Sequence, residues 1–269
     1  PHGDLLDLPQ QPLVDHVDRA EELVALAALV VVPGFLKNYG IHLFTTWLVF
    51  IIATMGLNLT VGYAGQKSLG HAAFFGIGAY TVAIMAVEGM NNAWISWPVS
   101  IAVSALFALA IGAISLRTRG VYFIMITLAF AQMLFYLINS IKAYGGDEGL
   151  NIKRRSDFGV GIDFKDEVAF YLLVLGILVV CLVLIHRLMH ARFGRVILAV
   201  RDDDLRAESV GFPVYRYKLI LFVIAGAMGG LAGALMVNQQ NYVSPNLLHW
   251  TQSGVLMIMV ILGGVGTLT

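Results

Sequence analysis

Charged residues are scarce in this chain. Asp, Glu, Lys and Arg make up only 13% of its 269 residues, whereas 58% are hydrophobic. Soluble domains carry about 25% charged residues. The 17 basic and 17 acidic residues balance, so net charge indicates no nucleic-acid partner. The composition predicts an all-α, polytopic membrane protein.

Cysteine is almost absent as well. The single residue, Cys181, lies in an apolar run, which excludes an intrachain disulfide and is typical of a packing residue. The patterns CxxC and HExxH are missing. His186 and His190 are four residues apart at the end of an apolar run, but no carboxylate lies near them in the sequence. We interpret them as cations at the membrane boundary and expect no metal site.

Nucleotide-binding motifs are also lacking. Gly62–Ser68 has part of a phosphate-binding-loop pattern, but Gln66 stands where a glycine would precede Lys67, and no buried strand comes before it. Gly76–Gly78 has no third glycine for a dinucleotide fingerprint. With no catalytic constellation, we expect a chain that is not an enzyme and binds no cofactor itself.

Acidic residues are missing from the interior of the apolar runs. Glu88 ends one run, at its boundary. Proton-coupled transporters use chains of intramembrane acids, so their absence argues against a proton-driven secondary transporter. Active transport would then need an energy source on another subunit, such as a separate ATPase.

Long apolar runs divide the chain into membrane segments. At about 20 apolar residues per crossing, we predict about eight segments: 23–36, 41–62, 70–87, 94–115, 120–141, 168–186, 218–240 and 250 onward.

The stretch before these segments, residues 1–22, has a different character. It contains six acidic residues against Arg19 alone, the reverse of a signal peptide. We expect an acidic N-terminal segment followed by a transmembrane domain over 23–269. Because the chain begins at Pro1 and ends at Thr269 within an apolar run, we expect both ends to be trimmed.

Basic residues set the predicted orientation. The loop 187–217 and the Lys218 that follows it carry seven Lys and Arg residues, which places this loop in the cytoplasm. Counting the predicted membrane crossings back from this loop puts the Arg117/Arg119 turn and the N-terminus on the same side. The loop from Lys142 to Glu167 falls outside, although its five basic residues run against the rule.

Glycine is concentrated in Gly56–Tyr80, between two apolar runs. Each glycine costs a helix about 1 kcal/mol relative to alanine. In lipid, backbone freed from a helix is tolerated where protein or a water-filled cavity satisfies it. The stretch predicts a broken helix that lines a polar path; a tight turn with close helix packing is the open alternative.

The cytoplasmic loop 187–217 has the pattern of a short helix. Asp202–Asp204 are suited to cap its start, Gly211 to end it, and Pro213 prevents continuation. Because its apolar area is small and the three acids would be repelled by an anionic leaflet, we expect a protein partner rather than a lipid surface.

Two other glycine patterns leave alternatives open. Tyr144–Leu150 in the outer loop is suited to a turn, either as a solvated connector or as a docking element. Gly226, Gly230 and Ala234 recur every four residues, as do Gly229 and Gly233; this spacing is typical of a face for helix or subunit contact.

Several long motifs in register, over residues 50–269, closely resemble the LivM-type permeases of branched-chain amino-acid ABC importers. Lys67 departs from the apolar residue expected at its position. The segments that carry the resemblance are Gly56–Tyr80, Gly120–Gln132, Gly145–Leu150, Ala199–Asp202, Ala207–Gly211, Tyr217–Lys218, Gly230–Ala234 and Leu262–Thr267.

The resemblance implies one half of a permease in a bacterial cytoplasmic (inner) membrane. Its expected partners are a LivH-type second permease, two cytoplasmic ATPase subunits that bind ATP and Mg, and a periplasmic or lipid-anchored binding protein that delivers a neutral amino acid. The region Ala207–Gly211 resembles the helix that couples such permeases to their ATPases. The expected coupling residues are Asp203, Asp204, Leu205, Arg206, Ala207, Glu208, Ser209 and Gly211.

For the substrate path, polar residues at the break and on the fifth segment are the candidates. A zwitterion needs a donor and an acceptor but no full counter-charge. The candidates are Gln66, Ser68, His71, Thr127 and Gln132. In the open alternative, Gln132 and Asn139 make hydrogen bonds between helices, worth about 0.6 kcal/mol each.

Two alternative functions remain. Urea and short-amide importers have permeases that share much of this pattern. A self-sufficient secondary transporter or channel would instead work without an ATPase.

Overall fold

The computed structural model describes residue 29 and residues 38–90, 92–152, 155–156 and 166–266. The predicted acidic segment 1–22 lies outside these residues. So does the first predicted membrane segment, 23–36, apart from Leu29.

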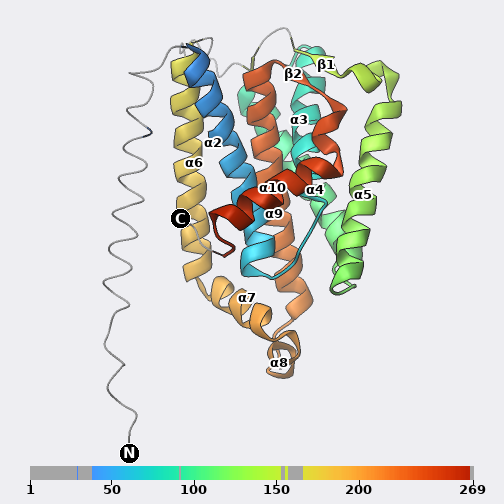
Figure 1. The fold of residues 1–269 in the computed structure, drawn as a ribbon, viewed down its shortest axis with the longest axis vertical. Coiled ribbons are helices and arrows are strands. Elements are labelled where there is room, and N and C mark those ends of the chain that lie inside the picture. The colour runs from blue at the N-terminus through green and yellow to red at the C-terminus, as the bar shows by residue number, and fades with distance from the viewer. Residues whose placement is uncertain (1–28, 30–37, 91, 153–154, 157–165, 267–269) are drawn as a thin grey trace, which may run out of the picture.

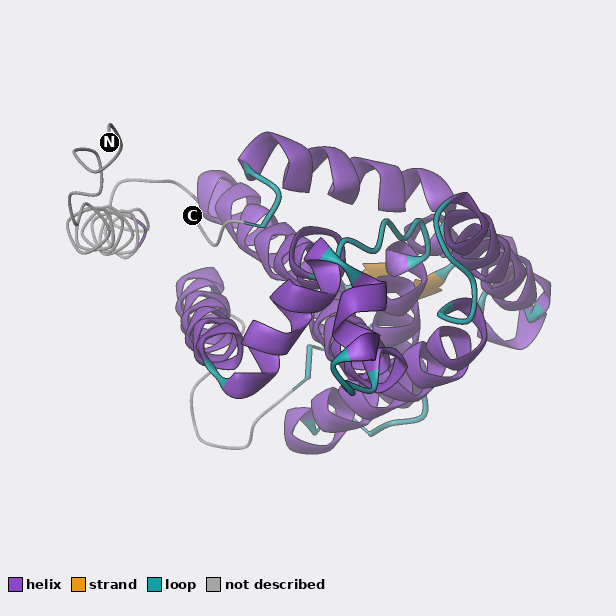
Figure 2. Cartoon of the chain, turned by 90° about the horizontal axis from the view of Figure 1, so that it is seen from below, coloured by secondary structure: helices purple, strands orange, loops and turns teal. Residues whose placement is uncertain are grey.

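Helices make up most of the described chain (Figures 1 and 2). The α-helices are α2 Asn38–Asn58, α3 His71–Val87, α4 Ala93–Ser115, α5 Val121–Ser140, α6 Glu167–His190, α7 Arg192–Asp202, α8 Asp204–Ser209, α9 Val214–Gln240 and α10 Trp250–Gly263. A π-helix, η2 Leu59–Tyr63, continues α2, and three short 3₁₀ turns are η3 Lys142–Tyr144, η4 Gly146–Glu148 and η5 Pro245–Leu248. Strands β1 Leu150–Asn151 and β2 Tyr242–Val243 pair antiparallel.

The described helices fit a multi-pass membrane protein, but they do not confirm eight crossings. Each of the last seven predicted segments coincides with a helix. Among the described residues, five helices are long and apolar enough to span a bilayer: α2 with η2, α4, α5, α6 and α9. At 1.5 Å per residue, the 17 residues of α3 and the 14 of α10 are shorter than a core of about 30 Å.

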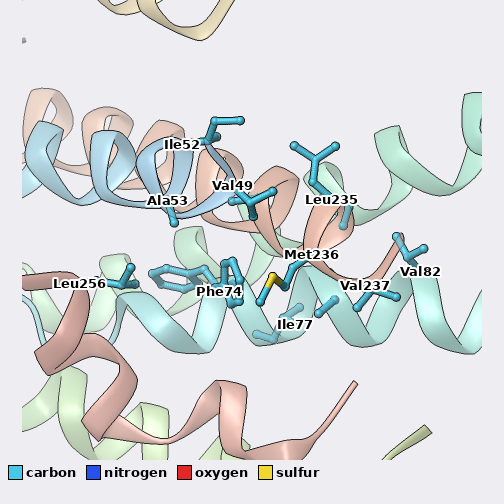
Figure 3. Packing of buried hydrophobic residues seen from close by; sticks show 14 of the residues in the cluster. Val49, Ile52, Ala53, Phe74, Ile77, Val82, Leu235, Met236, Val237 and Leu256 are labelled. Carbon is cyan, nitrogen blue, oxygen red and sulfur yellow. The ribbon is translucent and has the colours of Figure 1, made fainter. Parts of the chain in front are cut away.

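The core lies where α9 packs between α2 and α3. In its most apolar window α9 is 72% buried, whereas α5, at one side of the bundle, is 22% buried. Val49 of α2, Phe74 and Ile77 of α3 and Leu235 of α9 meet in this core (Figure 3).

Glycines allow α9 to approach its neighbours closely. A Cβ added to Gly230 would lie 2.3 Å from Ser104 Oγ of α4, and one added to Gly233 would lie 1.9 Å from the Phe75 carbonyl oxygen of α3. The small-residue faces predicted from the sequence therefore serve helix contact within this chain.

The bundle has two dissimilar ends. The loop 187–217 forms α7 and α8 at one end, drawn at the bottom of Figure 1. The Arg119 turn between α4 and α5 lines the same cavity as the junction of α7 and α8. These two basic segments share an end, as the orientation argument requires.

The loop between α5 and α6, which the sequence predicts to lie outside, is tied to the end of α9 at the opposite end of the bundle (Figure 1). Gly145 and Gly149 have positive φ values of 84° and 77°. Leu150 pairs with Val243, and Tyr242 Oη donates to the Glu148 carbonyl, 2.8 Å away. In its described part, the loop is thus held against the bundle rather than being a free connector.

Candidate functional site

The predicted break is present between η2 and α3. Residues 64–70 are not helical, and Gly65 has a φ of +66°. The backbone N–H of Gln66 donates to the Thr60 carbonyl at 2.8 Å, and the backbone N–H of Gly70 donates to Ser68 Oγ at 3.2 Å. The backbone released from the helix is partly satisfied within the protein, as the membrane interior requires.

The break contacts α5 and α10 as well as α3. A Cβ added to Gly70 would lie 2.8 Å from the Thr127 carbonyl oxygen. The Ala72 amide, in the first turn of α3, donates to Ser253 Oγ of α10 at 2.9 Å. The start of α3 is therefore held between two helices that are distant in the sequence.

Gln66 is the predicted path residue that faces an open space. Its side chain is 8% exposed and lines a cavity of about 740 Å³. Neither the nitrogen nor the oxygen of its side-chain amide has a hydrogen-bond partner among the described residues. A buried amide without partners costs about 1–3 kcal/mol, which indicates that a ligand or water is needed there.

The other predicted path residues are placed differently. Ser68, His71 and Thr127 are at most 2% exposed, and none of the three lines this cavity. His71 Nε2 would lie 3.3 Å from a Cβ at Gly56, so its ring points between α2 and α9. Gln132 is half-buried further along α5 and does not line the cavity. The structure thus groups Ser68, His71 and Thr127 around Gly70 and separates Gln132 from them.

The cavity lies at the end that carries α7 and α8. Its walls come from four places: the break at 64–67, the turn and start of α5 at 116–124, the α7–α8 junction at 200–208, and the start of α9 at 214–218. It therefore joins the broken helix to the short helix in the loop 187–217.

The short helix predicted in the loop 187–217 is present as α8. Asp203 caps it, because its carboxylate accepts from the amides of Leu205 and Arg206 at 3.0 and 3.1 Å. Gly211 follows it with a φ of +94°. Lys218 of α9 forms an ion pair with Asp204, which joins the start of α8 to a membrane helix.

One side of α8 is open to solvent. Ala207 faces inward and is buried, whereas Arg206, Glu208 and Ser209 are exposed. Leu205 and Val210 are also 64% and 71% exposed. Apolar and charged side chains together at the tip of the molecule are suited to contact with a protein.

Sequence reasoning did not identify the buried amides at the end of α9. Gln239 Nε2 donates to the His42 carbonyl at 2.6 Å and to Thr46 Oγ1 at 2.9 Å. Asn238 Oδ1 accepts from the Ser156 amide at 2.8 Å. Two adjacent amides at the end of an apolar run were the available signal, and their bonds indicate a structural role.

The fold and site define a class: a multi-pass helical membrane protein with a broken helix, a polar cavity at one end and an exposed helix beside it. Residues 40–269 match the family model described as branched-chain amino acid transport system / permease component, and the chain belongs to this family.

Individual relatives agree. The high-affinity branched-chain amino acid transport system permease protein LivM of Salmonella typhimurium is 31% identical over 95% of this chain and 66% of its own length. LivM of Escherichia coli is 32% identical over 91% of this chain and 63% of its own length. The L-arabinose transport system permease protein AraH of E. coli is 29% identical over 52% of this chain and 40% of its own length. The chain thus spans about two thirds of the length of these LivM relatives. No solved structure matches it.

Proposed function

We propose that this chain is a permease subunit of an ATP-driven importer for branched-chain or other neutral amino acids. The observation that carries the proposal is the match of residues 40–269 to the permease family. The Asp203-capped helix α8, exposed beside Lys218 and Asp204, supports coupling to a separate subunit.

The proposed assembly lies in a bacterial inner membrane. A second, LivH-type permease completes the path, two ATPase subunits bind ATP and Mg, and a periplasmic or lipid-anchored protein delivers the amino acid. This chain itself holds no cofactor and catalyses no reaction. Motion of α8 driven by the ATPases changes the population of the inward-open and outward-open states.

Reconstitution tests the proposal. Vesicles that contain the full assembly, its binding protein and ATP are expected to take up labelled leucine, and vesicles with this chain alone are not. Uptake of urea but not leucine would favour the short-amide alternative. Concentrative uptake by the chain alone, without ATP, would contradict the proposal.

Within the proposed path, Gln66 is the residue to test first. Gln66→Leu is expected to lower leucine uptake about tenfold, since one hydrogen bond of about 1.4 kcal/mol to the passing amino acid is lost. Because an amide without partners is removed, the thermal stability of the purified assembly is expected to stay the same or rise.

Gln240→Leu is the matched control. Gln240 is exposed at the other end of α9, so its change is expected to leave uptake unaltered. Normal uptake by Gln66→Leu would remove Gln66 from the path.

A further inference from the structure

The cytoplasmic cavity has a composition that the passage of a solute alone does not require. Its volume, about 740 Å³, is within the range of about 300–1,000 Å³ for small-molecule sites. One part of the lining is apolar, including Leu116, Phe123 and Val200, and other parts carry charges of both signs.

The charges come from separate elements. Lys67 lies on the break, Arg119 on the α4–α5 turn, and Asp202 at the end of α7. In the described part of the chain, the ion pairs at this end join Asp203 to Arg206 and Asp204 to Lys218. Five charged residues that line the cavity take part in neither pair: the cations Lys67, Arg119 and Arg201 and the anions Asp202 and Glu208.

Gln66 supplies an independent indication of a ligand. It is more than nine-tenths buried, it lines the cavity, and both polar atoms of its amide lack partners among the described residues. An amide can donate to a carboxylate and accept from an ammonium group. Cations, an anion, an amide and an apolar wall together match a zwitterion with an apolar side chain.

We propose that this cavity binds a free neutral amino acid from the cytoplasm, and that the bound amino acid slows import. The choice of ligand rests on the proposed function. An anionic ligand such as a phospholipid headgroup is disfavoured, because Asp202 and Glu208 also face the space.

The inhibition follows from where the walls lie. Lys67 belongs to the break, while Leu205 and Glu208 belong to α8. A ligand between them contacts the path and the coupling helix at once. If motion of α8 reshapes the cavity, a ligand that fits the resting shape stabilises the resting state by its difference in affinity for the two states.

The test uses the full assembly in vesicles whose ATPase subunits face the outer medium, with binding protein and labelled leucine inside. Millimolar unlabelled leucine added outside with ATP is expected to lower both ATP hydrolysis and the release of label, whereas glutamate at equal concentration is not. Lys67→Gln and Arg119→Gln are each expected to raise the half-inhibiting leucine concentration about tenfold, with inhibition measured relative to the uninhibited rate of the same variant.

Arg117→Gln is the matched control, because Arg117 is exposed on the same turn but does not line the cavity. Labelled leucine is also expected to bind the resting wild-type assembly without ATP or binding protein.

The outcomes separate the two proposals. ATP-driven transport that outside leucine does not slow would overturn the inhibitory site and leave the proposed function standing. No ATP-driven transport at all would instead overturn the proposed function. Inhibition that Lys67→Gln and Arg119→Gln leave unaltered would place the ligand elsewhere, and equal inhibition by glutamate would contradict selection of a neutral amino acid.

Discussion

Gly233→Val is expected to destabilise the folded bundle strongly and thereby to lower the yield of folded protein and its uptake. A Cβ at Gly233 would lie 1.9 Å from the Phe75 carbonyl oxygen and 2.8 Å from the Ala79 amide nitrogen. Both are backbone atoms of α3, so no rotation of a side chain relieves the overlap, and α3 and α9 must move apart. Overpacking of a core costs about 1–3 kcal/mol and occasionally more, and this contact lies in the most buried of the five spanning-length helices in the described residues.

The measurement is the yield of monodisperse protein in detergent, together with uptake in vesicles. Gly176→Val is the matched control: it is also a glycine in an apolar helix, but a Cβ there would have no atom within 4 Å. The control is expected to retain most of its yield. Equal loss in both variants would mean that helix propensity, rather than the α3–α9 contact, sets the requirement for glycine.

The ends of several elements were predictable because the forces there are local. Asp203 caps α8 through amides two and three residues ahead, and Gly211 follows the helix with a positive φ. Such signals lie within a few residues of sequence. The break at 64–70 was predictable for the same reason, from the density of glycine alone.

The π-helix η2 was not predictable, because it depends on contacts distant in the sequence. Asn58 Oδ1 accepts from the Gly266 amide at 3.0 Å. A Cβ at Gly62, within η2, would lie 2.5 Å from the same Gly266 nitrogen. No local pattern around Leu59–Tyr63 records a partner that is about 200 residues further along the chain.

Contacts distant in the sequence also decide which of the candidate path residues lines the cavity. Spacing placed Gln66, Ser68 and His71 together at the break, and the structure keeps them there. Which of them faces a cavity depends on how the break turns against α5 and α10, and this is set by the Gly70–Thr127 contact and the Ala72–Ser253 hydrogen bond. Only Gln66 of the three lines the cavity.

Reversing a charge on the exposed side of α8 is also expected to have a large effect on uptake. Arg206→Glu and Glu208→Lys are each expected to lower ATP-driven uptake at least about tenfold, since a loss of 1.4 kcal/mol in a protein contact already changes its equilibrium tenfold. Both variants are expected to fold as the unaltered chain does. The Arg206 side chain is 84% exposed and lies 3.9 Å from Asp203, and an exposed pair of this kind contributes at most about 1 kcal/mol.

A defect in coupling differs from a defect in assembly in what the ATPases do. If α8 transmits motion, the variants insert into the membrane and hydrolyse ATP, but hydrolysis no longer drives uptake or responds to loaded binding protein. Arg117→Glu reverses an exposed charge at the same end of the bundle, on the α4–α5 turn rather than on α8, and is expected to leave the ratio of uptake to hydrolysis unchanged. Normal uptake by both α8 variants would remove the coupling role, because reversed charges at a working contact change its complementarity whichever partner supplies the opposing groups.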